Sequence, residues 1–77
     1  MERYKNLSGD SGVVAYEIRR DSIRVQFGDH IYTYDAATVG RDALQKMKAL
    51  AVAGRGLSSF ISTEVRDSYT SKSTLST

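Results

Sequence analysis

Apolar and polar residues alternate in three short segments in the first half of the chain. Alternation with a period of two is the pattern of a half-buried β-strand, and it occurs over residues 13–19, 23–27 and 31–34. In the first segment, the expected apolar face consists of Val14, Tyr16 and Ile18. Because clusters of turn-forming residues separate the segments, the pattern predicts three antiparallel strands joined by short turns.

The period lengthens to three and four residues in the second half of the chain, as in an amphipathic helix. The apolar positions of the first such run are Ala36, Val39, Ala43, Leu44, Met47, Leu50 and Ala51. We expect a helix over residues 38–53, with Asp35 or Thr38 capping its start and Gly54 ending it. A second run, from Leu57 to Tyr69, predicts another helix.

This order of elements defines a fold class. A three-stranded sheet must cover its apolar face, and the two helices are the only available cover. We therefore expect an α+β fold, in which a three-stranded antiparallel β-meander is followed by two amphipathic helices packed on one face. Residues 12–70 would form this single domain, with 1–11 as a flexible lead and 71–77 as a disordered tail rich in Ser and Thr.

Length and composition limit the classes of protein that the chain can represent. Its 77 residues provide for one hydrophobic core, and the absence of Cys excludes disulfides and thiolate metal clusters. The polar first residues lack the apolar run of a secretory signal. The longest apolar stretch, Ala49–Ala53, is far shorter than a membrane span. We expect a cytoplasmic protein that is not embedded in a membrane.

Catalytic chemistry has little support in the sequence. The segment Gly9-Asp10-Ser11-Gly12 matches the surroundings of the nucleophile in trypsin-like proteases, but the other parts of that machinery and the chain length it needs are missing. His30 lies beside Asp29 in a turn and could act as a base, although an exposed turn residue is the simpler interpretation. We expect no enzyme activity, no metal and no cofactor.

Positive charge is concentrated in the second half of the chain, since residues 41–77 contain six basic and three acidic residues. The turn Gly54-Arg55-Gly56 opens into a predicted helix, whose free N–H groups could bind an anion. Arg41 and Lys48 share one ridge of the first helix and could follow a phosphate backbone. The alternatives are a helix stop at the turn and an ordinary solvated helix face.

Tyrosine supplies five of the seven aromatic residues. Tyr32 and Tyr34 are two residues apart in a predicted strand, so their side chains project to the same face. On an open face, one of these rings could stack on a single-stranded base. Under the helices, both would belong to the core, which a small domain needs its aromatic residues to fill.

The chain contains the motifs Val14-Ala15-Tyr16-Glu17, Val25-Gln26-Phe27 and Tyr32-Thr33-Tyr34, followed by an apolar helix and a Gly-Arg turn. In this pattern it resembles the KTSC domain, a family named after the C-terminal domain of some lysyl-tRNA synthetases that also occurs as short stand-alone bacterial proteins. The resemblance covers residues 13–69, and Tyr32 and Tyr34 match the family's Tyr-x-Tyr motif. A proline often follows this motif in the family, whereas here Asp35-Ala36-Ala37 follows.

The resemblance implies a binding domain for RNA, since the family is associated with an enzyme that charges tRNA. Our sequence hypothesis is a non-enzymatic module that binds RNA or tRNA. Its candidate contact residues are Gly54, Arg55, Gly56, Arg41, Lys48, Tyr32 and Tyr34. The alternative is a module for protein interaction or self-association, which would use a sheet edge or an exposed apolar patch.

Overall fold

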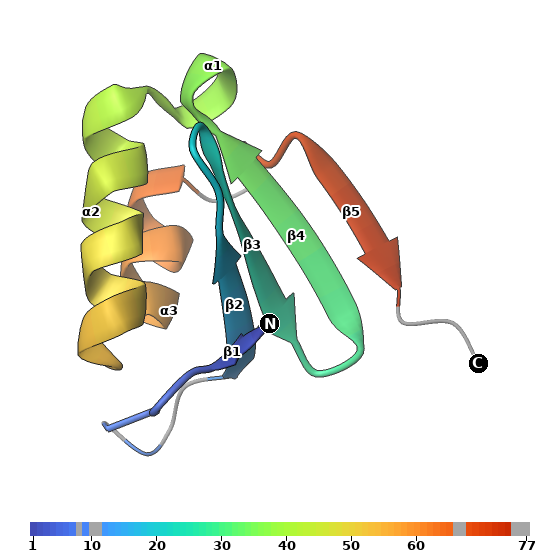
Figure 1. Cartoon of the computed structure of the whole chain (residues 1–77), viewed down its shortest axis with the longest axis vertical. Coiled ribbons are helices and arrows are strands. Elements are labelled where there is room, and N and C mark those ends of the chain that lie inside the picture. The colour runs from blue at the N-terminus through green and yellow to red at the C-terminus, as the bar shows by residue number, and fades with distance from the viewer. Residues whose placement is uncertain (8, 10–11, 66–67, 75–77) are drawn as a thin grey trace.

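The computed structural model describes residues 1–7, 9, 12–65 and 68–74. Its strands are β1 (Glu2–Arg3), β2 (Val13–Ile18), β3 (Ser22–Phe27), β4 (His30–Asp35) and β5 (Ser71–Thr74). Its helical segments are α1 (Ala36–Val39), α2 (Arg41–Ala53), α3 (Leu57–Phe60) and the π-helical turn η1 (Ile61–Val65). Figure 1 shows the helices on one side of the sheet, so the expected α+β class is confirmed.

All neighbouring strands pair antiparallel, in the order in which they occur along the chain, β1-β2-β3-β4-β5. The three strands predicted from the alternation are β2, β3 and β4. The expected count of three strands is wrong, because β1 and β5 extend the sheet by one strand at each edge. These edge strands lie within residues 1–11 and 71–77, outside the expected domain; residues 8, 10–11 and 75–77 are not among the described residues.

The segment that follows β1 packs into the core through Tyr4, whose side chain is 3% exposed. The Tyr4 amide donates to the Val14 carbonyl at 3.0 Å, and its hydroxyl accepts a hydrogen bond from the Leu57 amide at 3.3 Å. Farther along, the Leu7 amide donates to the Gly54 carbonyl at 2.7 Å. The start of the chain is therefore attached both to the sheet and to the turn between α2 and α3.

A β-bulge changes the expected apolar face of β2. The pairing shifts between Val13, which lies opposite Phe27, and Ala15, which lies opposite Gln26. One additional residue at this position changes the alternation of side chains between the two faces. As a result Val13 is buried and Val14 is 44% exposed. The prediction that Val14 belongs to the apolar face is wrong for this reason.

The predicted helix over residues 38–53 begins differently from expectation. Asp35 caps the short helix α1, because its carboxylate accepts from the Thr38 amide at 2.9 Å and from the Thr38 hydroxyl at 2.6 Å. Hydrogen bonds, first from Thr38, hold the pKa of Asp35 below its usual value. Gly40, with φ of 89°, separates α1 from α2. Gly54 ends α2 in the left-handed conformation, as predicted.

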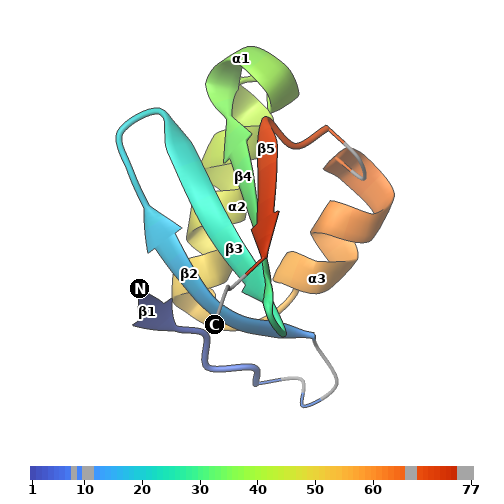
Figure 2. The ribbon, with the colours of Figure 1, turned by 90° about the vertical axis from the view of Figure 1, so that its right-hand side faces the viewer.

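The core lies between the sheet and the helices. Its most deeply buried side chains are Ile23, Val25, Tyr34, Met47 and Leu57. Figures 1 and 2 show α2 and α3 side by side over the same face of the sheet. The opposite face of β2 and β3 carries charges, where Arg24 and Glu17 form an ion pair at 3.0 Å. The hydrogen bond from Arg24 lowers the pKa of Glu17.

Candidate functional site

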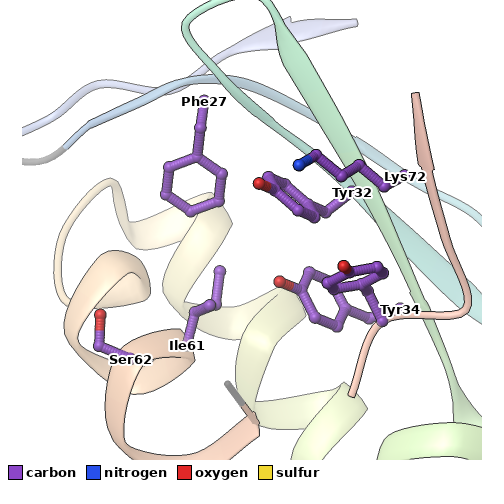
Figure 3. Close-up of a pocket in the computed structure, with 7 residues that line it drawn as sticks. Phe27, Tyr32, Tyr34, Ile61, Ser62 and Lys72 are labelled. Carbon is purple, nitrogen blue, oxygen red and sulfur yellow. The ribbon is translucent and has the colours of Figure 1, made fainter. Parts of the chain in front are cut away.

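An open groove lies between the sheet and the helical segment that follows α2. Its volume is about 760 Å³, within the range of sites that hold small ligands or side chains. The residues that line it are Phe27, Tyr32, Tyr34, Ile61, Ser62, Tyr69 and Lys72. Figure 3 shows Phe27, Tyr32 and Lys72 along one side, with Ile61 and Ser62 of η1 across from them. We call this feature the aromatic groove.

Four aromatic rings form the wall of the aromatic groove and contact one another edge to face. The Tyr32 ring meets Phe27 at a centroid distance of 5.7 Å and Tyr69 at 5.0 Å. Tyr69 also meets Tyr34 at 6.4 Å, with an angle of 85° between the ring planes. Such pairs contribute about 0.5–1.5 kcal/mol each beyond the burial of their surface. The aromatic wall is therefore preformed before any ligand is bound.

Lys72 brings a positive charge to the rim of the aromatic groove. It lies opposite Tyr32 in the ladder between β4 and β5, and its Nζ is 5.4 Å from the centre of the Tyr32 ring, within cation–π range. No carboxylate of the described residues forms an ion pair with Lys72, and the described lining contains no Asp or Glu. Within the part of the chain that the structure describes, the groove thus combines apolar rings with a cation, Lys72, that no carboxylate pairs.

The strand that carries Lys72 is an edge of the sheet. All four residues of β5 are exposed, and β5 pairs with β4 on one side only. The residue before β5, Thr70, fixes the start of the strand. Its amide donates to the Thr33 carbonyl at 2.6 Å, and its hydroxyl lies 2.8 Å from the Thr38 hydroxyl. In Figure 2, β5 lies at the front of the sheet with α3 beside it.

The two tyrosines singled out from the sequence both face the helices. Tyr34 is 1% exposed and belongs to the core, so in this conformation it offers no free ring face for stacking. Tyr32 is only partly buried and lines the aromatic groove. Both side chains therefore project from the face of the sheet that the helices cover, and Tyr32 is the one of the two that is partly exposed in the groove.

The predicted basic ridge of α2 lies beside the turn between β2 and β3. The Lys48 ammonium donates to the carbonyl of Arg20 at 2.9 Å, and Arg20 and Arg41 are both exposed. Arg41 and Lys48 are about 10 Å apart along the helix axis. No ion pair among the described residues uses these three cations. We call Arg20, Arg41 and Lys48 the cationic flank.

The turn Gly54-Arg55-Gly56 joins α2 to α3 and has a structural role in the described chain. Gly54 is buried, and a Cβ there would lie 2.6 Å from the Cβ of Lys5. The first amide of α3, on Leu57, already donates to the Tyr4 hydroxyl. Arg55 itself is exposed. One of the N–H groups expected to bind an anion, that of Leu57, is thus occupied, while the Arg55 side chain stays accessible.

The candidate residues from the sequence fall into three separate regions. Arg41 and Arg55 lie at opposite ends of α2, about 20 Å apart, and Tyr32 lies in the aromatic groove between the sheet and η1. The sequence analysis missed Phe27, Tyr69 and Lys72 as groove residues. Lys72 lies opposite Tyr32 in the sheet, which the sequence would have indicated only if β5 had been recognised as a strand, and Tyr69 lies outside the strands.

The described residues contain neither a cluster of metal ligands nor a membrane-spanning helix. The described part of the chain holds no group of three or more His, Cys, Asp or Glu side chains that could bind a metal. His30 contacts Asp29 at 3.6 Å and the Thr74 hydroxyl at 3.2 Å. Among residues 1–7, 9, 12–65 and 68–74, no helix is both long enough and apolar enough to cross a bilayer.

Over the described residues, the fold is that of a small α+β protein with a five-stranded antiparallel sheet, helices on one face and an aromatic groove at one edge. Comparison of the chain with protein-family models, with curated proteins and with solved structures found no match. The resemblance to the KTSC domain therefore stays a prediction, which rests on the residues quoted above.

Proposed function

We propose that this protein is a small, non-catalytic, cytoplasmic binding module that holds an extended peptide of a partner protein against β5 and the aromatic groove. The observation that carries the proposal is the position of a preformed aromatic groove directly beside an exposed edge strand. An extended peptide can pair with such an edge through its main chain, while its alternate side chains enter neighbouring pockets.

The composition of β5 favours reversible binding of a ligand over a permanent interface with another protein chain. The strand contributes three hydroxyl residues and one lysine, so pairing with it buries little apolar surface beyond the groove. A second copy of β5 offers no carboxylate to match Lys72. The groove, through the partly exposed rings of Phe27, Tyr32 and Tyr69, supplies the apolar surface that a single side chain of a ligand strand can fill.

The test is selection of binders from a random heptapeptide library on the immobilised protein, followed by titration of individual peptides. Tyr69→Ala removes part of the groove wall, and we expect the selected peptides to bind it at least about tenfold more weakly, as for an aromatic contact residue. Val52→Ala, on an exposed position of α2, is the matched control and should bind normally. Peptides that bind both variants equally would refute the proposal.

A second candidate function, RNA binding, is favoured by the cationic flank. The hydrogen bond from the Lys48 ammonium to the Arg20 carbonyl places the helix ridge beside the β2–β3 turn, so that the cations of the two elements are neighbours. The test is fluorescence anisotropy with labelled tRNA and single-stranded RNA at low and physiological salt. Binding by this surface should weaken with salt and with Arg41→Ala. Lys46→Ala, an exposed cation of α2 outside the cationic flank, is the control; no binding at low salt would exclude this function.

A further inference from the structure

We infer that the peptide held at β5 is acidic, with a carboxylate opposite Lys72 and a large apolar side chain two residues away in the aromatic groove. This inference rests on the proposed function and adds the chemical class of the ligand. Its basis is the position of Lys72, a cation with no ion pair to any described residue, on the strand that the ligand would join.

The orientation of Lys72 is decisive. Because it lies opposite Tyr32 in the ladder, its side chain projects from the same face of the sheet as Tyr32, toward the groove. A residue opposite Lys72 on an added strand would place its Cβ about 4.5–5.5 Å away. At that distance an opposite charge is favourable and a like charge is unfavourable. A glutamate or aspartate therefore fits this position.

The period of the strand then fixes the spacing of the motif. Residues two apart on a strand project to the same face, with about 6.6–6.8 Å between them. The residue two positions from the acidic one therefore also faces the groove, toward Tyr32 and Tyr69. A residue one position away projects to the opposite face of the sheet and cannot reach Lys72. The ligand motif is thus an apolar and an acidic residue separated by one residue, in either order.

The experiment uses fluorescein-labelled eight-residue peptides of threonine that carry one phenylalanine and one charged residue, titrated by anisotropy against the full chain. The first pair of peptides has Glu two residues before or after Phe. Two further peptides move Glu to the position next to Phe or replace it with Lys. We expect the better peptide of the first pair to bind roughly twofold to fivefold more tightly than either of the others.

Charge reversal on the protein provides the second arm. Lys72→Glu should invert the order, so that the Lys peptide binds more tightly than the Glu peptide. Ser73→Glu is the matched control, because residue 73 lies opposite Ile31 and projects to the other face; it should leave the order unchanged. Both substitutions are on an exposed strand, and thermal unfolding of each variant verifies that the fold is retained.

The outcomes separate the two levels of the proposal. Peptides that all bind with equal affinity, weakened by Tyr69→Ala, would overturn the acidic motif and leave strand binding in place. If no peptide binds in these titrations and the library selection also yields no groove binder, both the motif and the proposed function are refuted. Displacement of a bound Glu peptide by single-stranded RNA, lost on Lys72→Glu, would overturn the peptide motif and assign the groove to RNA.

Discussion

The hydrogen bond between the Tyr4 hydroxyl and the Leu57 amide provides a direct test of how the start of the chain contributes to the fold. Tyr4→Phe keeps the buried ring and removes the acceptor, which leaves the amide of Leu57 without its partner. An unpaired buried donor costs about 1–3 kcal/mol. Since this bond is long, at 3.3 Å, compared with a usual value near 2.9–3.0 Å, we expect a loss near 1 kcal/mol.

That loss is large enough to measure. A domain of 77 residues has a free energy of unfolding of roughly 4–12 kcal/mol at about 0.05–0.15 kcal/mol per residue, and 1 kcal/mol lowers the midpoint of thermal unfolding by about 4–8 °C at this size. The assay is thermal unfolding followed by circular dichroism, with urea unfolding as the second measurement.

Tyr16→Phe is the matched control for Tyr4→Phe. The Tyr16 ring packs against the core, and its hydroxyl has no hydrogen bond to another described residue, so its removal should leave the midpoint nearly unchanged. The reasoning fails if Tyr4→Phe unfolds at the temperature of the unmodified protein, or if the two substitutions lower the midpoint equally. Either result would mean that the hydroxyl of Tyr4 contributes nothing specific to the packing of this segment.

Two further predictions concern a close approach of the backbone and a helix cap. Gly54→Ala should destabilise the fold by about 1–2 kcal/mol for the left-handed backbone and by more for the contact with Lys5 at 2.6 Å. Gly28→Ala, with positive φ and open space, isolates the backbone part, and equal losses of urea stability in the two variants would contradict the contact. Asp35 has a lowered pKa in the folded state, so its stabilisation is present above its usual pKa of about 4 and is lost as pH falls through the folded value. Urea midpoints between pH 2 and 7 should therefore fall less steeply on acidification for Asp35→Asn, and an unchanged slope would exclude Asp35 as the source.

The central elements were predictable because their periodicity is strong. Strands β2, β3 and β4 and helix α2 each bury one face, and the alternation of apolar residues reports that burial directly. The bulge in β2 was not predictable, since Val13, Val14 and Ala15 are all apolar and any of them could be the residue left unpaired. Only the register against β3 decides between them.

The edge strands and the groove had no comparable signal. β1 has two charged residues, and β5 has four polar ones that stay exposed. Both are held by ladder hydrogen bonds that any sequence can make, with no buried face to mark them. Because β5 was not predicted, Lys72 could not be paired with Tyr32. The aromatic groove therefore follows from tertiary structure and could not be derived from spacing along the chain.

The sequential order of the sheet has a consequence for how its parts separate. Strands β2, β3 and β4 meet through short turns, whereas β5 reaches β4 only after the chain has passed through residues 36–70. Closing a flexible loop of that length costs roughly 3 kcal/mol of entropy, and the cost falls once the helices have already shortened the path. The β5 strand thus depends on the folded helices, while the three central strands do not depend on it. Strand β5, which brings Lys72 to the rim of the aromatic groove, can therefore detach and return while the strands that carry Phe27, Tyr32 and Tyr34 stay folded.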